Sequence, residues 1–327
     1  MSVPKSQHTI PQCYLKQFVD LKTPPGQEPY VWIFERNSKK GRKRAPKNIL
    51  TETDVYTFKG KDGGKDYVLE ETLAQIEGDY TTMYERTIIR KVPLNQKEHV
   101  ILCGFVAAML QRTMKQKENI EDYFDRLKSM VENLEKAHEI PPKLSAQLEQ
   151  QKENAHKMMI VQTLPQIARI LGMMNLAFLC ADGRSSFITS DAPCAVFNPE
   201  LQWQRFYGPG LVQRHVEVSL PLSPGICVLF SWVNNLRGYL RIGQDKVHEQ
   251  NRMVVGHSHE HFIANSPRLK RRWFPSLSAR PGLHLADGNE QIKDEICGVA
   301  PQTPCLKRTN SEWPSTLSPR ECRRKPK

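Results

Sequence analysis

Long apolar runs are missing from this 327-residue sequence. No stretch reaches the roughly 18 apolar residues that a membrane-spanning helix requires, so we predict no membrane contact. No apolar run follows residues 1–5, and a signal peptide is therefore not indicated. Hydrophobic residues still make up 39% of the chain, which is enough to build a core. Together these features predict a cytoplasmic protein.

Several motifs of known chemistry are also absent. The eight cysteines form no Cys-x-x-Cys pair, which argues against a zinc ribbon and favours reduced thiols. The Gly- and Lys-rich turn at residues 59–66 lacks the Gly-Lys-Ser/Thr ending of a phosphate-binding loop. No Gly-x-Ser-x-Gly elbow, internal repeat or known nucleic-acid-binding motif occurs. The sequence therefore identifies neither a cofactor nor a familiar catalytic class.

The positive charge is concentrated near the end of the chain. The formal net charge is +12, and residues 266–327 hold 13 Lys and Arg against 6 Asp and Glu, a net of +7. Eight prolines, many Ser and Arg, and no apolar periodicity predict that residues 266–327 form a disordered basic tail. This tail can contact nucleic acid or another anionic ligand, or it can simply remain solvated.

The remaining residues, 1–265, are predicted to form a single α+β domain. Branched and aromatic runs at residues 30–34, 54–58, 176–180, 216–222, 226–232 and 257–264 indicate strands. Helical spacing dominates from about residue 67 to 175, including a highly charged helical hairpin at 115–160. The sequence thus predicts an antiparallel or mixed sheet packed against a mainly helical middle region.

The strand at residues 187–189 ends abruptly in Ser190 and Asp191. Pro193 biases the preceding residue away from helix, and an aspartate in a turn can fold its carboxylate back onto backbone amides. Loops at strand ends also often carry functional sites. Asp191 is therefore either a structural cap or a site residue.

Two further polar groups stand in apolar surroundings. His8, Gln12 and Lys16 recur at four-residue spacing, which would place them on one face if a helix extends that far. They would form either a solvated stripe or a triplet aimed into a cleft. Gln111 and Arg112 follow a helix that is apolar all round, and a buried arginine must be paired. The partner is a structural carboxylate, Asp191 or a glutamate, or else a substrate anion.

Two other patterns suggest ligands only weakly. His257, His259 and His261 would share one face of a strand at steps of about 7 Å, which suits a single metal ion poorly. We therefore predict no metal site. The basic run at residues 39–44 is predicted to be a hairpin loop that either grips phosphate or is merely solvated.

Taken together, these residues resemble a bacterial family known only as domain of unknown function 4238, over about residues 6–265. The resemblance rests on His8-x-x-Pro11-Gln12-x-Tyr14-Leu15-Lys16-x-Phe18, the strand around Trp32, Pro46-Lys47-Asn48 before Tyr56, Glu71, Glu77, Gln111-Arg112, Ser190-Asp191-x-Pro193, Leu220-Pro221-Leu222-Ser223-Pro224 and Asn251. The family name carries no activity. The resemblance implies only that these residues belong to one framework.

Two functions are compatible with these observations. In the first, the chain is an enzyme acting on an anionic, phosphoester or nucleic-acid-like substrate. His8 would transfer a proton, Asp191 would act as a base or orient His8, and Arg112 would bind the anion. The substrate would be held by Gln12, Lys16, Gln111 and Ser190.

In the second function, the chain is a nucleic-acid-binding or protein-interaction module, and His8, Arg112 and Asp191 form a purely structural network. An open cleft lined by these three side chains would favour the enzyme, whereas burial and mutual satisfaction would favour the structural network. The oligomeric state is not indicated by the sequence.

Overall fold

The computed structural model describes residues 6–59, 64–137, 143–201, 210–233 and 236–274. The predicted tail beyond residue 274 lies outside the described residues. Among the helices of the described segments, none combines the length and apolar character needed to cross a membrane. The fold is α+β, as the sequence predicts.

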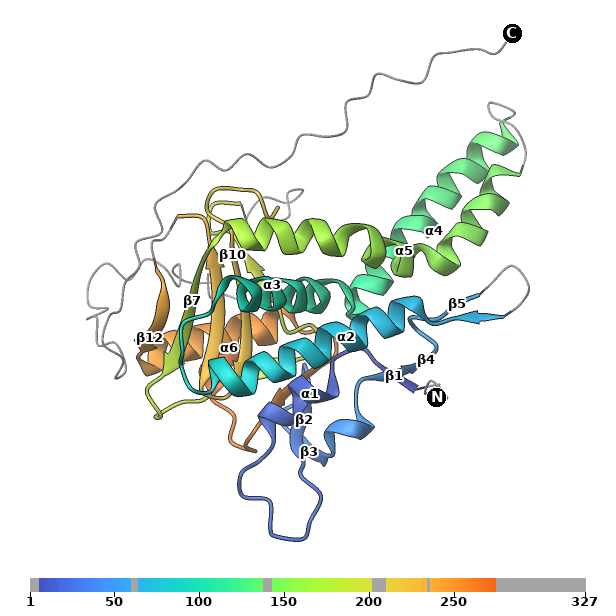
Figure 1. The fold of residues 1–327 in the computed structure, drawn as a ribbon. Coiled ribbons are helices and arrows are strands. Elements are labelled where there is room, and N and C mark those ends of the chain that lie inside the picture. Colours follow the sequence, from blue (N-terminus) through green and yellow to red (C-terminus); the bar gives the residue numbers. More distant parts are fainter. Residues whose placement is uncertain (1–5, 60–63, 138–142, 202–209, 234–235, 275–327) are drawn as a thin grey trace. The chain divides into compact units, whose positions relative to one another are not determined.

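Six α-helices and thirteen strands make up the described part of the chain (Figure 1). The helices are α1 Gln12–Leu15, α2 Val68–Met83, α3 Gln96–Gln111, α4 Met114–Lys136, α5 Leu144–Met173 and α6 Gln244–His257. The strands are β1 Ser6–His8, β2 Val31–Glu35, β3 Gly41–Arg44, β4 Thr51–Thr53, β5 Phe58–Lys59, β6 Lys65–Asp66, β7 Asn175–Ala181, β8 Thr189–Ser190, β9 Ala195–Phe197, β10 Glu217–Ser223, β11 Ile226–Ser231, β12 Gly238–Ile242 and β13 His261–Ala264.

A five-stranded sheet in the order β12-β7-β11-β10-β9 forms the centre of the fold. Its pairs are antiparallel except for β12 and β7, which run parallel. Because side chains alternate along a strand, Phe178 and Val228 pack into the main core with α3 and α5. Leu179 and Leu229 face the other way, into the cluster that contains Val247 of α6. Helices therefore cover both faces of this sheet (Figure 1).

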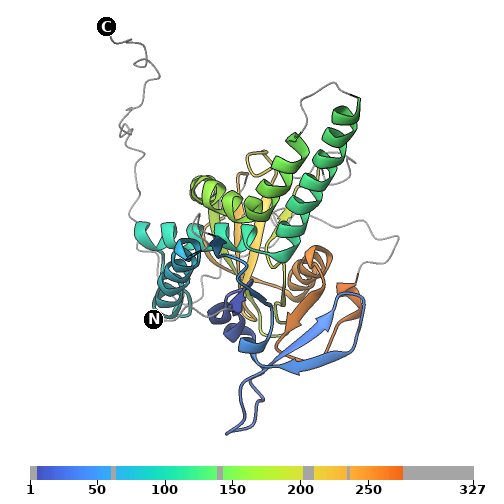
Figure 2. The same ribbon diagram turned by 90° about the vertical axis from the view of Figure 1, so that its right-hand side faces the viewer.

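A second sheet, in the order β3-β2-β13-β8, joins segments that are far apart in the sequence. The N-terminal strands β2 and β3 lie beside β13, as Figure 2 shows. Strand β8 completes the sheet at the edge, where Phe262 pairs with Ser190. The turn that contains Asp191 is thereby fixed next to the start of β13.

The helical middle region is held by local and tertiary contacts. Asn95 caps α3 through a reciprocal capping box with Glu98. The end of α5 packs into the main core through Ile167 and Leu171, while its first half pairs with α4. Pro165 lies inside α5, which continues through it. The predicted charged hairpin is therefore formed by α4 and the first half of α5.

Three local predictions were wrong. Helix α6 extends to His257 and β13 begins only at His261, because the backbone leaves the helical conformation at Ser258, where ψ is 146°. The predicted strand at 54–58 is interrupted by Asp54, whose φ of 53° turns the backbone. The basic run at 39–44 is only partly loop, since Gly41–Arg44 forms β3 against β2.

The start of the predicted tail packs against the domain. Arg271–Trp273 forms a short 3-10 helix, and the Trp273 side chain is buried. The Trp273 indole Nε1 donates to Nδ1 of His248 on α6 at 2.9 Å. The packed structure thus continues to at least residue 274, nine residues beyond the predicted boundary at 265.

Candidate functional site

His8 and Arg112, which are 104 positions apart, meet in the structure. His8 does not belong to a helix with Gln12. It ends β1, which pairs with β4, so His8 faces Thr51 of the neighbouring strand. Arg112 is the C-cap of α3, and its Nη2 donates to the His8 carbonyl oxygen at 2.5 Å. The arginine thereby ties the end of a buried helix to the N-terminal strand.

The charge of Arg112 is already engaged by protein groups. The side chain is only 3% exposed, and Nη1 donates to the Glu77 carboxylate of α2. Its guanidinium lies 5.2 Å from the centroid of the Tyr56 ring, a cation–π contact. Burial disfavours the charged form, but Tyr56 and Glu77 outweigh it and raise the pKa of Arg112. Of the predicted partners, a structural glutamate is the one observed.

Three polar atoms near this ion pair are buried without a hydrogen-bond partner: His8 Nε2, Arg112 Nε and Glu70 Oε2. Burial lowers the pKa of His8, although the Pro46 backbone and Glu77 oppose it. Burial likewise raises the pKa of Glu70 against the influence of Arg112. Two acceptors and one donor in a partly dry environment are what a small polar ligand or a water molecule would satisfy.

The other residues predicted to bind substrate are dispersed. Gln12 is half-buried at the first position of α1, whereas Lys16 is exposed. Gln111 is buried, and its carbonyl oxygen bonds Nε2 of His156 at 2.8 Å. Its side-chain Oε1 has no partner. Of this group only Gln111 adjoins Arg112 directly, through the chain itself.

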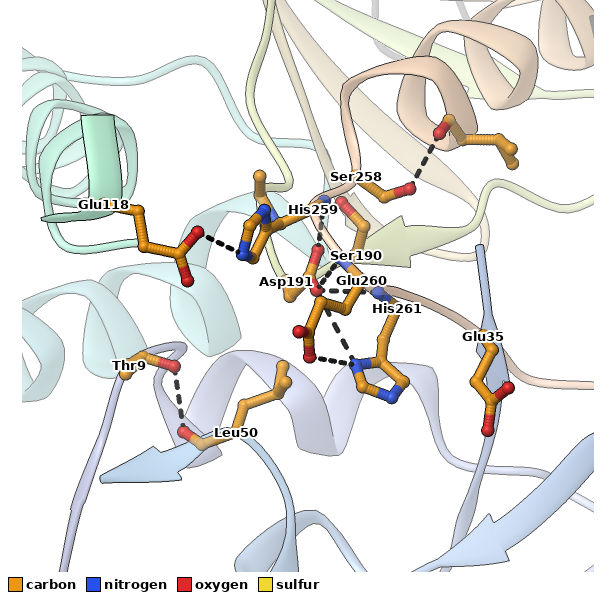
Figure 3. A network of polar contacts seen from close by, with 12 residues as sticks. Thr9, Glu35, Leu50, Glu118, Ser190, Asp191, Ser258, His259, Glu260 and His261 are labelled. Atoms are coloured by element: carbon orange, nitrogen blue, oxygen red, sulfur yellow. Dashed lines mark hydrogen bonds and ion pairs between the residues drawn. The ribbon is translucent and has the colours of Figure 1, made fainter. Parts of the chain in front are cut away.

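Asp191 acts on a different part of the chain. Its carboxylate, only 7% exposed, accepts three backbone N–H bonds: from His259 at 2.8 Å, and from Glu260 and His261 at 2.7 Å each (Figure 3). Ser190 is fully buried, and its hydroxyl accepts the Ala192 amide. Asp191 therefore caps the segment between α6 and β13, which is the structural role weighed for it.

Charged side chains surround this cap. His259 Nε2 contacts Glu118 of α4 at 3.0 Å, and His261 Nδ1 lies 3.8 Å from the Asp191 carboxylate (Figure 3). Lys115 donates to the His257 carbonyl. Burial lowers the pKa of Lys115, Arg36 lowers it further, and Asp191 opposes both. The described contacts include no hydrogen bond or ion pair between Asp191 and either His8 or Arg112.

A metal site at the three histidines and a phosphate site at residues 39–44 have little support in the described residues. No group of three or more His, Cys, Asp or Glu side chains in the described segments is placed to hold a metal ion. In the basic run, Arg42 pairs with Glu35, and Lys43 Nζ lies 4.5 Å from the centroid of the Tyr30 ring. These two cations of the run are thus engaged by the protein itself.

Sequence reasoning missed how far the Arg112 network extends. Gln7 is buried and bonds both the Tyr56 amide and the Thr57 hydroxyl, and the Tyr56 hydroxyl donates to the Arg112 carbonyl. The usable signal was on α2, where Glu70 and Glu77 are seven residues apart and so share one helical face. No signal in the sequence pointed to Gln7.

A groove of 1060 Å³, which we call the hairpin groove, runs along the α4–α5 hairpin. Its lining contains no Asp, Glu, Lys, Arg or His. It consists of amide, aromatic and aliphatic side chains: Gln116, Asn119, Ile120, Tyr123, Phe124, Gln147, Gln150, Gln151, Asn154, Ala155, Met158, Met159 and Gln162. An uncharged lining on a highly charged hairpin distinguishes this surface from its surroundings.

Comparison with known proteins identifies one family. The family described as protein of unknown function (DUF4238) matches residues 6–268, in agreement with the resemblance read from the sequence. Searches of curated proteins and of solved structures found no match. The matched region contains both polar networks, the hairpin groove and nearly all of the described fold. The chain therefore belongs to the DUF4238 family of proteins of unknown function.

Proposed function

We propose that the chain is a protein-interaction module that holds a partner in the hairpin groove, and that His8, Arg112 and Asp191 have structural roles. The observation that carries the proposal is the uncharged groove. The burial and internal pairing of Arg112 and Asp191 support the second part, because charges spent on protein groups are poorly available to a substrate.

The charges of the hairpin neutralise one another across its two helices. Lys128 of α4 pairs with Glu149 of α5 at 2.8 Å, and Lys152 of α5 pairs with Asp125 of α4 at 2.5 Å. These pairs fix the spacing of α4 and α5 and leave the groove to amide and apolar groups. A surface of this kind favours a partner segment that is itself uncharged.

The shape and chemistry of the groove fit an amphipathic helix. On α5 the lining extends from Gln147 to Gln162, which corresponds to about 22 Å of helix. Met158 and Met159 offer adaptable apolar contacts, and Tyr123 offers an exposed aromatic face. We expect a partner helix of about 15 residues that buries apolar and amide side chains. Nucleic acid is disfavoured because no cation lines the groove.

The test uses the full chain and a display library of helical peptides about 15 residues long. Selected peptides should carry an uncharged face, and Ala155→Arg, which places a charge in the groove, should weaken their binding by about tenfold or more. The matched control is Ala146→Arg on the exposed surface of the same helix, which should leave binding unchanged.

Equal binding by both arginine variants, or selection of charged faces, would refute the groove as the binding surface. Sedimentation velocity provides an independent check. If the wild-type chain dimerises and only Ala155→Arg dissociates the dimer, the occupant is a second copy of the chain, and the proposal of a separate partner helix is wrong.

A second candidate is supported by the three unpartnered atoms beside Arg112. In this enzyme, His8 Nε2 would accept a proton and Arg112 Nε would donate to an anionic oxygen of the substrate. Asp191 would only position the neighbouring chain. Glu70 and Glu77 would repel a dianion, so a singly charged phosphodiester fits better than a phosphomonoester.

The enzyme is tested by a screen of phosphodiesters with the wild-type chain, His8→Gln and His99→Gln. His99 is a suitable control because, like His8, it is half-buried with a pKa lowered by burial, but it lies on α3. Activity that is lost only in His8→Gln supports catalysis at this site. Activity that survives in His8→Gln removes the assignment.

A further inference from the structure

A small cavity of 200 Å³ lies where α6, the segment after β7 and the segment after β13 come together. It is separate from the hairpin groove and from both polar networks. Its floor includes Ser185, His248 and Trp273, each less than 10% exposed. Ser185 Oγ lies 3.4 Å from His248 Nε2. The floor is thus polar, buried and built from three separate segments.

The contacts of His248 fix its protonation. Trp273 Nε1 can only donate, so His248 Nδ1 must accept and cannot hold a proton while this bond lasts. The single ring proton is therefore on Nε2. The Gln244 amide nitrogen lies 2.9 Å from Nε2, so this amide must turn over and accept the proton through its oxygen. The imidazole is held neutral. It adds no charge to the floor, and both of its ring nitrogens are engaged by Gln244 and Trp273.

The rim of the cavity is cationic. Arg184, Arg268 and Lys270 line it, and none of the described lining residues is acidic. Arg184 is 3.9 Å from Asp182, whereas Arg268 and Lys270 make no ion pair with any described residue. Three cations, two of them unpaired, surround a floor that carries the hydroxyls of Ser185 and Ser186, and this environment attracts an anion.

We propose that this cavity binds a phosphate group. Its volume is below the roughly 300–1,000 Å³ typical of pockets for whole small molecules, so it accommodates a terminal phosphate and little else. The rim cations would meet the phosphate oxygens, and the hydroxyls of Ser185 and Ser186 would donate from below. This inference gives a specific role to the basic residues at the start of the predicted tail.

The proposal is tested by isothermal titration calorimetry, in which inorganic phosphate is titrated into the full chain at constant ionic strength. Arg268→Ala and Lys270→Ala should each weaken binding by about threefold, and the double variant by about tenfold. Arg271→Ala is the matched control, because Arg271 is exposed and adjacent but does not line the cavity. It removes the same charge and should leave the affinity unchanged.

The source of the phosphate group is distinguished by competition. A phosphoserine peptide and a nucleoside monophosphate should both displace inorganic phosphate, and the tighter competitor identifies the natural class of ligand. Absence of binding at millimolar phosphate would overturn the proposal. So would an equal loss of affinity in Arg271→Ala and Lys270→Ala, because the attraction would then come from net charge and not from the cavity.

Discussion

Replacing Asp191 with alanine should destabilise the fold substantially. The carboxylate is 7% exposed and accepts amide hydrogens from three consecutive residues, His259, Glu260 and His261, at 2.7–2.8 Å. These bonds hold the connection between α6 and β13, and β13 in turn pairs with β2 and β8. The Asp191 side chain thus helps to position β13 as it enters the second sheet.

The expected loss is smaller than the sum of three bonds. A hydrogen bond to a charged group contributes about 1.5–3 kcal/mol, but such contributions are not additive. Glu260 is exposed, and His259 and His261 are half-buried, so water can reach the amides that the substitution frees. We therefore expect Asp191→Ala to lower the free energy of unfolding by about 3 kcal/mol, a large share of the 5–15 kcal/mol typical of domains.

Urea denaturation followed by circular dichroism measures this loss. Asp191→Asn should fall between the wild type and Asp191→Ala, because it keeps one acceptor oxygen. Asp245→Ala is the control: its side chain is 94% exposed, so losing its ion pair with Arg272 should cost less than about 0.5 kcal/mol. A catalytic carboxylate usually costs stability, so its removal should leave stability unchanged or raise it. A loss of less than about 0.5 kcal/mol in Asp191→Ala would refute the structural role.

Three further predictions concern other buried groups. Glu77→Gln leaves the Arg112 cation without its counter-charge and should lower the free energy of unfolding, measured by urea denaturation, by about 2 kcal/mol. This loss is smaller than for a fully buried ion pair because Glu77 is partly exposed. Burial lowers the pKa of His257 in the folded protein. As the pH falls below about 6.5, His257 is therefore protonated in the unfolded chain before it is protonated in the folded one. Stability should therefore decline in acid, and less steeply in His257→Asn. Trp273→Phe removes the N–H bond to Nδ1 of His248, so the pKa of His248 should rise. NMR titration measures this change.

The sequence predicted the strand end that contains Asp191, but it did not predict which backbone amides the Asp191 carboxylate accepts. Branched residues before Ser190 and the proline at 193 predicted both the strand and its abrupt end, and an amide-capping aspartate was one of two readings. The amides that donate to Asp191 lie about 70 positions further along the chain, at residues 259–261. Nothing in local composition encodes that pairing, because it depends on β13 reaching the edge strand β8.

Arg112 shows the same division between local and long-range information. Its place on a buried helical face predicted that it must be paired, since an unpaired buried charge is too costly. The choice of Glu77 depends on how α2 packs beside α3, which periodicity does not fix. The four-residue spacing of His8 and Gln12 would place both on one helical face only if a helix extended to His8. Pairing with β4 keeps it in a strand instead.

Several residues that carry the family pattern share one physical task. Arg112 donates to the His8 carbonyl, Asp191 accepts backbone amides, and Tyr14 donates to the Pro221 carbonyl at 2.6 Å. Asn251 likewise accepts the Ile188 amide. Each side chain satisfies a backbone group from a distant segment, and a buried backbone group left unpaired would be costly.

This shared task leaves few of these side chains for catalytic chemistry. A side chain whose polar atoms are committed to fixed backbone groups holds the fold together and has little capacity left for a substrate. Besides the three unpartnered atoms beside Arg112, the polar groups that remain available lie in the amide-lined hairpin groove and on the cationic rim above Ser185. Those two surfaces, one uncharged and one positive, therefore carry the binding functions proposed for this protein.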